Sequence, residues 1–229
     1  MRAARSRPST PSRDMKRHAT PIRIINTRVE HTTACAELEQ ICYPTLADEE
    51  KFRAEQFENH IALFPEGQWV AIDAASGRVV GATGGFRTTK EAVQTHNFFE
   101  MTSNGWFTRH DPSAPYYHGA TMTVLPEYRG RGIARLFYEA RKAMCQALNL
   151  RGQIICGMLP SYAKFAQSMS ATDYIRYVDA GFLFDPTLTV QIRNGFKVEG
   201  LVKDYFDDPP SRGWAVLAVW TNPDYTPAY

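Results

Sequence analysis

The sequence predicts a mixed α/β fold in which one sheet is covered by helices on both faces. Two observations lead to this prediction. Apolar segments of strand length alternate with amphipathic helical segments in the middle of the chain, and three connections are of hairpin type. Alternation alone favours a parallel sheet, whereas hairpins join antiparallel neighbours, so a mixed sheet accounts for both. The 229 residues, 44% hydrophobic and 22% charged, are enough to bury one large core.

Seven apolar segments supply the strands of this sheet. The clearest hairpin joins 68–73 to 78–86 through Ala74-Ala75-Ser76-Gly77. Residues 87–115 are polar and irregular, and a helical turn is expected near 90–100. The expected strands are 22–29, 68–73, 78–86, 117–125, 153–158, 196–202 and 214–220.

Two helices are expected between the first and second strands. Thr32 or Thr33 is expected to cap the first, and Asp48 to cap the second, which runs to about His60. The apolar face of the first helix is expected to consist of Ala34, Leu38, Ile41 and Cys42.

The clearest helix of the chain begins at Ile133. Apolar residues recur there at i, i+3, i+4 and i+7 over four turns, with charged side chains on the opposite face. Residues 160–195 are expected to be mostly helical, with Ser170 or Thr172 as a cap.

Charge is unevenly distributed along the chain. Residues 1–20 carry six basic side chains and one acidic side chain, whereas the other 209 residues carry a net charge of −3. The body is therefore not basic, which argues against a nucleic-acid partner. The basic segment lacks the apolar core of a secretory signal, and its arginine and serine content is similar to that of a mitochondrial transit peptide. We interpret 1–20 as a disordered leader, with a true start at Met15 as a further alternative, and 21–229 as one domain.

Composition also excludes several classes of protein. The longest apolar run, Trp214–Trp220, is far shorter than the roughly 20 residues that span a membrane. The four cysteines form no C-x-x-C pair, and no H-E-x-x-H motif occurs, so we expect neither a metal site nor a disulfide framework. We expect a cytoplasmic protein with reduced thiols and leave a homodimer open.

The most informative stretch joins a strand to the long helix through a glycine-rich turn. It reads Val124-Leu125-Pro126-Glu127-Tyr128-Arg129-Gly130-Arg131-Gly132-Ile133-Ala134-Arg135-Leu136. The first amides of a helix have no intrahelical acceptor, and the helix dipole is positive there, so this end suits phosphate groups. Neither a Walker A loop nor a dinucleotide fingerprint fits, because no Lys-Ser or Lys-Thr pair follows the glycines and Arg135 takes the place of the third glycine.

The stretch resembles the acetyl-CoA loop of the GNAT superfamily of N-acetyltransferases, whose pattern is Arg/Gln-x-x-Gly-x-Gly/Ala. Arg129, Gly132 and Ala134 match it. The family's order of elements (strand, two helices, three strands, helix, strand, helix, two strands) fits the order expected over 22–221. The resemblance implies a mostly antiparallel seven-stranded sheet flanked by helices and splayed between its fourth and fifth strands.

The C-terminal part is similar to one subgroup, the acetyltransferase domain found ahead of nitrilase-like carbon–nitrogen hydrolases. The segments that carry this similarity are Asp185-Pro186-Thr187-Leu188, Asn194-Gly195-Phe196, Gly213-Trp214-Ala215-Val216-Leu217 and Trp220-Thr221-Asn222-Pro223. No hydrolase segment follows them before Tyr229.

The resemblance implies that an amine attacks the thioester of acetyl-CoA directly, without a metal. It assigns the thioester arm to the backbone of Met122, Thr123 and Val124. It assigns the pyrophosphate to the loop residues Arg129, Gly130, Arg131, Gly132, Ile133, Ala134 and Arg135.

Residues for proton transfer are few. His118, at the start of the fourth strand, has the intrinsic pKa range of a base. The family often supplies a tyrosine four residues before the Gly-Phe pair to protonate the thiolate, but Gln191 stands there. Tyr162 is the nearest replacement. As alternatives, His118 could simply be hydrogen-bonded at the strand edge, and Tyr162 could simply be packed at the end of the sheet.

The acceptor is expected to be a small-molecule or peptide amine. In this fold its side of the site is built by Tyr43–Phe64 and Tyr205–Arg212, where Glu49, Glu50, Asp207 and Asp208 suit a cation or are plain surface acids. The alternative function is a CoA-binding regulatory module without turnover, because Gln191 cannot act as an acid. Binding of nucleic acid through the basic leader is the weakest reading.

Overall fold

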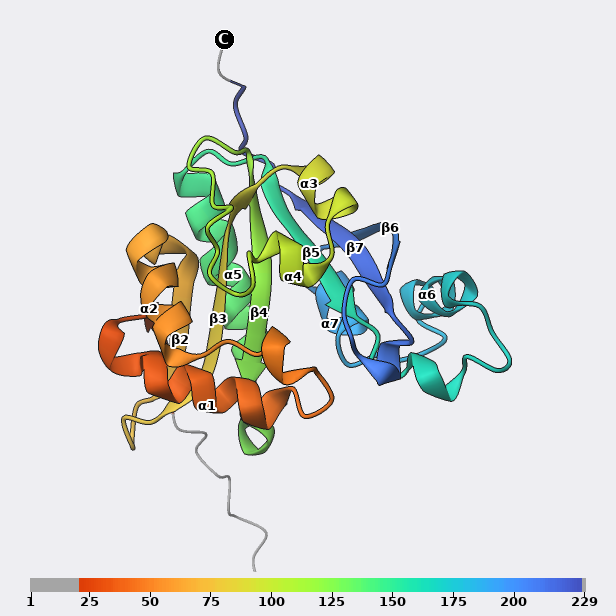
Figure 1. The fold of residues 1–229 in the computed structure, drawn as a ribbon, viewed down its shortest axis with the longest axis horizontal. Coiled ribbons are helices and arrows are strands. Elements are labelled where there is room, and N and C mark those ends of the chain that lie inside the picture. Colours follow the sequence, from red (N-terminus) through yellow and green to blue (C-terminus); the bar gives the residue numbers. More distant parts are fainter. Residues whose placement is uncertain (1–20, 228–229) are drawn as a thin grey trace, which may run out of the picture.

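The computed structural model describes residues 21–227 and shows one seven-stranded sheet in the order β1-β2-β3-β4-β5-β7-β6 (Figure 1). All neighbouring strands are antiparallel except β4 and β5, which are parallel. The predicted fold class is therefore confirmed, whereas the leader expected at 1–20 lies outside the described residues. The strands are β1 (Ile22–Asn26), β2 (Gln68–Asp73), β3 (Val79–Thr88), β4 (Tyr116–Val124), β5 (Gly152–Met158), β6 (Lys197–Lys203) and β7 (Trp214–Thr221).

Helices cover both faces of this sheet. The helices α1 (Thr32–Cys42) and α2 (Ala54–Leu63) lie on one face, and α5 (Ile133–Ala147) lies on the other. The short helices α3 (Lys90–Thr95) and α4 (Phe98–Met101) lie in the segment expected to be irregular. The helices α6 (Ala171–Asp179) and α7 (Leu188–Arg193) pack with α5 against β5 and β7.

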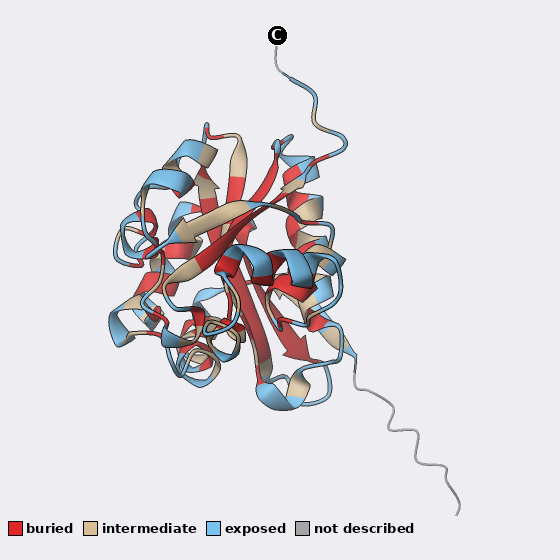
Figure 2. Ribbon diagram, turned by 90° about the vertical axis from the view of Figure 1, so that its right-hand side faces the viewer, coloured by how far each residue is buried: buried red, intermediate tan, exposed pale blue. Residues whose placement is uncertain are grey.

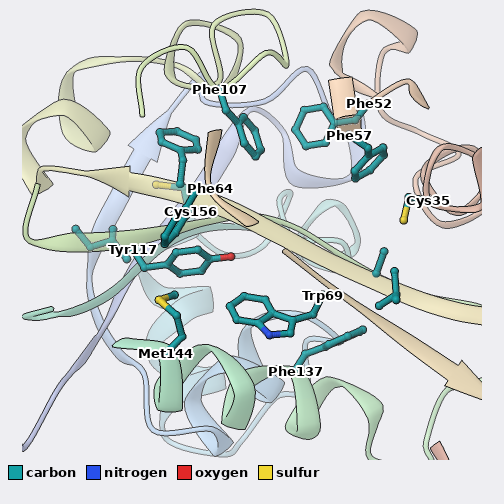
Figure 3. Packing of buried hydrophobic residues seen from close by; sticks show 14 of the residues in the cluster. Cys35, Phe52, Phe57, Phe64, Trp69, Phe107, Tyr117, Phe137, Met144 and Cys156 are labelled. Atoms are coloured by element: carbon teal, nitrogen blue, oxygen red, sulfur yellow. The ribbon is translucent and has the colours of Figure 1, made fainter. Parts of the chain in front are cut away.

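Apolar side chains fill the space between the sheet and the helices on both faces. Figure 2 shows strands that are largely buried beneath helices whose outer sides are exposed. In Figure 3, Phe52, Phe57 and Phe107 lie on one side of the strands, and Phe137 and Met144 lie beside a helix on the other. Within residues 21–227, every helix is too short or too polar to cross a membrane.

The parallel pairing of β4 and β5 is short, and this opens the centre of the sheet. Only Tyr116, Tyr117 and His118 pair with β5, opposite Gly152 to Ile154. Beyond His118 the two strands separate, while β3 stays paired with β4 as far as Val124. The far ends of β4 and β5 therefore present unpaired strand edges to each other, as the resemblance implied.

The second helix does not begin where the sequence indicates. Asp48–Glu50 forms a single 3-10 turn, Lys51 is extended, and the helix begins only at Ala54. The prediction of a cap at Asp48 is therefore wrong. Phe52 supplies the physical reason, because its buried ring stacks on Phe98 at 5.8 Å and the chain must leave helical geometry to place it there.

The first helix buries a face that overlaps the predicted one at Leu38 but is shifted away from Ile41. It begins at Thr32, but Ile41 is 49% exposed, whereas Cys35 and the carboxylate-bearing Glu39 are buried with Leu38. Because Glu39 is charged, this face does not form a continuous apolar pattern, so hydrophobic periodicity does not predict it. The buried carboxylate belongs to the site described next.

Candidate active site

A cleft of about 860 Å³ lies where β4 and β5 separate. Its walls come from the end of α1, from β4 and β5, from the start of α5 and from α7. The cleft therefore joins the glycine-rich loop to the centre of the sheet. Six residues of the loop line it: Arg129, Gly130, Gly132, Ile133, Ala134 and Arg135.

The loop leaves open space in front of the first turn of α5. Gly130 and Gly132 have φ angles of 75° and 82°, in the left-handed region that glycine adopts most easily. A Cβ atom at either position would meet nothing within 4 Å. The first helical bond inside the turn runs from the amide of Leu136 to the carbonyl of Gly132, so the preceding amides remain available as donors. This geometry fits a pyrophosphate.

The arginines of the loop have different surroundings. Arg129 donates from Nε to the carbonyl of Val124 at 3.1 Å. Arg135 forms an exposed ion pair with Glu139. Arg131 stacks on the ring of Tyr128 and is absent from the wall of the cleft, although the sequence grouped it with the others.

Alternate residues at the end of β4 direct their side chains into the cleft. Met122 and Val124 line the cleft, whereas Thr123 points its side chain toward β3, where it donates to the carbonyl of Ala82. The hydroxyl of Tyr43 accepts from the amide of Met122 at 3.2 Å and donates to its carbonyl at 3.0 Å. Tyr43 thus occupies the backbone groups that the resemblance assigned to the thioester arm.

His118 lies in the core, away from the cleft. It is 1% exposed, and its Nε2 lies 3.2 Å from the hydroxyl of Tyr205. Burial lowers its pKa to about 4, so the ring is neutral near neutral pH. The structure thus places His118 among packed side chains and not where an amine could reach it.

Tyr162 also lies outside the wall of the cleft. It belongs to a 3-10 turn, Tyr162–Lys164, after β5, is 6% exposed, and packs against Tyr174. Its hydroxyl donates to the carbonyl of Met169 at 3.3 Å. The surroundings match those of an aromatic side chain packed at the end of the sheet.

Gln191 does line the cleft. It lies on α7, is 5% exposed, and reaches across to Gly157 of β5. Its Oε1 is buried and has no partner among the described residues. The glutamine therefore occupies the space beside β5 and brings an unsatisfied acceptor there.

The carboxylate of Glu39 lies in the cleft although no sequence pattern indicated it. It lines the cleft, is 2% exposed, and accepts from the hydroxyl of Thr121 at 2.6 Å. Burial raises its pKa to about 7, against the opposing effects of the Thr121 hydrogen bond and the Lys51 charge. Glu39 is four residues after Cys35 and three before Cys42, and residues at these spacings share one face of a helix. This spacing was the signal that could have placed Glu39 on the buried face.

The two segments predicted to bound the acceptor side lie against each other. The amide of Asp207 donates to the carboxylate of Glu50 at 3.3 Å. Asp208 is buried and accepts from Thr45 and Ser211, so its charge is used inside the fold. Glu50 and Asp208 line the cleft and Glu49 is exposed, so Glu50 is the acid that faces both the cleft and solvent.

The Asp185 motif stabilises the loop between α6 and α7. The Asp185 carboxylate accepts from the amides of Thr187 and Leu188 with one oxygen and from Tyr174 and Ser161 with the other. This network ties α7 to the end of β5, which positions Gln191. In residues 21–227 no cluster of three His, Cys, Asp or Glu side chains could hold a metal ion.

Comparison with known proteins shows the relationships of the chain. Residues 32–158 match the model of the "Acetyltransferase (GNAT) family". The chain is 32% identical to "Probable hydrolase YhcX" of Bacillus subtilis over 93% of its length, but it spans only 41% of that protein. It is 28% identical to "Uncharacterized N-acetyltransferase YkwB" of Bacillus subtilis, covering 83% of this chain and 84% of that protein. The loading GNATL domain of CurA from Lyngbya majuscula has a similar fold, with a TM-score of 0.75 at 18% identity, over 88% of this chain and 98% of that domain.

Proposed function

Because the chain belongs to the acetyltransferase (GNAT) family, we propose that it transfers an acyl group from acyl-CoA to a primary amine by direct attack within the cleft between β4 and β5. One observation carries this proposal. A single cleft joins an open helix N-terminus, an edge of β4 that is not paired with another strand, and a buried carboxylate. These are the parts that bind a pyrophosphate, hold a thioester arm and accept a proton.

The residues of the cleft divide the binding of the donor between them. The amides of Gly132 to Arg135 bind the pyrophosphate at the positive end of α5. The hydroxyl of Tyr43 first moves away from the amide and carbonyl of Met122. These backbone groups then hold the thioester arm. Most of the acceleration then comes from fixing the thioester beside the incoming amine.

Glu39 accepts the proton of the attacking amine, directly or through a water molecule. A carboxylate with a pKa of about 7 is half ionised near neutral pH, where a base is most effective. Glu39 belongs to α1, which covers the same face of the sheet as the acceptor segments. Glu39 therefore takes the role that the sequence suggested for His118.

Tyr138 protonates the departing thiolate. Three tyrosines line the cleft, but Tyr43 donates to Met122 and Tyr128 donates to Asp73. The hydroxyl of Tyr138 has no partner among the described residues, and burial raises its pKa, which keeps it protonated. Tyr138 is thus the phenol of the cleft that is free to act as an acid.

The decisive experiment measures thiol release from acetyl-CoA in the presence of a panel of amines. The panel contains polyamines, amino acids, a lysine peptide and peptides with free N-termini. We expect at least one acceptor to raise thiol release well above the hydrolysis background, with the acetylated amine found by mass spectrometry. Acetyl-CoA binding without transfer to any acceptor would instead indicate a regulatory module and contradict the proposal.

A further inference from the structure

Arg141 is a buried guanidinium for which the described part of the chain provides no counter-ion. It lies on α5, is 2% exposed, and forms no ion pair with any carboxylate of residues 21–227. Nη2 donates to the carbonyl of Thr121 at 2.7 Å and also bonds the hydroxyl of Thr83 and, at 3.4 Å, the carbonyl of Gly84. Nε is buried without a partner.

A charge in these surroundings is costly unless something pairs with it. Arginine stays protonated at any physiological pH, so it cannot escape the cost by losing its proton. Buried charges are therefore normally paired with an opposite charge. Arg141 instead lines the cleft, so a ligand can reach it.

The position of Arg141 shows which part of a ligand would reach it. It lies two turns along α5 from Ile133, about 12 Å at 1.5 Å per residue. The helix begins beside the end of β4 and runs back along that strand, so Arg141 lies near Gly119, next to the point where β4 and β5 pair. This is the closed end of the opening between the strands.

The sheet is shaped to accommodate the guanidinium. A Cβ atom at position 119 would lie 2.5 Å from Nη1 of Arg141, so glycine leaves the room that it needs. The pairing with β3 shifts register at the same place, because Gly84 pairs with Thr121 and Gly85 with Gly119, which leaves Ala120 as a bulge. Gly119, Ala120 and Thr121 all line the cleft.

We propose that Arg141 binds a carboxylate at the far end of the acyl group, so that the preferred donor is the CoA thioester of a dicarboxylic acid. This proposal rests on the proposed function, which places the pyrophosphate at the start of α5 and the arm along β4. An acyl group attached to that arm points toward Gly119 and Arg141. A carboxylate on the acceptor fits less well, because the acceptor side lies across the sheet, with Glu39 on α1.

The first test uses the wild-type protein and compares two donors of nearly equal shape. Malonyl-CoA ends in a carboxylate, and isovaleryl-CoA carries an isopropyl group in its place. We expect isothermal titration calorimetry to give malonyl-CoA at least a tenfold lower Kd, because a charged hydrogen bond replaces an apolar contact. Equal affinities, or tighter binding of isovaleryl-CoA, would overturn the assignment of Arg141 while leaving the proposed function intact.

The second test replaces Arg141 and uses a matched arginine as the control. Arg141→Gln should remove the preference for malonyl-CoA, whereas Arg135→Gln, in the loop that meets the phosphates common to both donors, should weaken both equally. If Arg141→Gln does not fold, the wild-type comparison decides the question. A preference that survives in a folded Arg141→Gln variant would overturn the proposal, and binding of no acyl-CoA at all would overturn the proposed function together with it.

Discussion

Glu39 is held in an environment that opposes its charge, and two measurable properties follow from this. Its carboxyl is buried beside Thr121, and its pKa rises from 4.5 to about 7. The same shift makes the residue a base near neutral pH and makes its ionised form costly to the fold. Replacing Glu39 by a neutral side chain should therefore lower the activity and raise the stability of the fold above neutral pH.

The rate of acyl transfer should follow the ionisation of Glu39. We predict that kcat/KM rises with pH through about 7 and that Glu39→Gln lowers kcat by 10²–10⁴, because the amide cannot accept the proton. Steady-state thiol release between pH 5.5 and 9 measures both effects. Glu37→Gln, an exposed neighbour on the same helix, is the control and should retain the wild-type profile. An unchanged profile in Glu39→Gln would remove Glu39 from the mechanism.

The stability of the protein should respond to Glu39 in the other direction. A raised pKa in the folded state means that the native protein holds its proton more tightly than the unfolded chain between pH 4.5 and about 7. Stability from this group is thus present at low pH and is lost as the pH rises through 7. At pH 8, Glu39→Gln should be more stable than the wild type by on the order of 3 kcal/mol, and near pH 4.5 the gain should vanish. Urea denaturation at the two pH values measures this, and a gain independent of pH would show that burial is not the cause.

Comparing variants of Tyr138 and Tyr162 distinguishes a tyrosine that protonates the thiolate from one that only packs in the fold. Tyr138 lines the cleft, and Tyr162 does not. We predict that Tyr138→Phe lowers kcat by 10²–10⁴ with little change in the affinity for acetyl-CoA, whereas Tyr162→Phe keeps more than half of the rate. If the two variants behave in the reverse way, the tyrosine that the sequence suggested would be the acid.

At the scale of elements, the proposed function assigns binding of the donor to the start of α5. Gly132→Glu would place a side chain and a negative charge in the open space before the helix. We predict that the affinity for acetyl-CoA falls at least tenfold, about 1.4 kcal/mol, while the circular dichroism spectrum stays native. Gly181→Glu is a matched control, because Gly181 also has a positive φ, of 80°, and open surroundings, but lies after α6. Equal losses of affinity in both variants would indicate general strain instead of a binding site.

The sequence predicts elements well where a single signal dominates. The periodicity from Ile133 defines α5, and the glycines before it define the turn, so this helix and its glycine-rich start were predictable. The second helix was misplaced because burial of Phe52 overrides the local preference of Asp48 for a cap. Glu39 and Arg141 were missed because charged side chains on buried faces contradict the pattern used to find those faces.

At the scale of the whole molecule, buried histidines limit stability in acid. His60 and His118 are neutral in the core, with pKa values lowered by burial to about 3 and about 4. The unfolded chain binds protons at both residues below about pH 6.5, so stability is lost as the pH falls through this range.

A single variant isolates this effect from the other titrating groups. We predict that the difference in Tm between the wild type and His118→Gln shifts in favour of the variant as the pH falls from 7 to 5. Differential scanning calorimetry at several pH values measures it. A difference that stays constant with pH would show that His118 has the same pKa in the folded protein as in the unfolded chain, and that burial does not lower it.

Amide hydrogen exchange shows whether acyl-CoA binds in the cleft between β4 and β5. Exchange is followed by mass spectrometry with and without saturating acetyl-CoA. We expect slower exchange in residues 119–124 of β4 and in residues 129–136, which form the loop and first turn of α5, with little change in α2 or α6. Protection confined to other segments, or no protection despite measured binding, would contradict it.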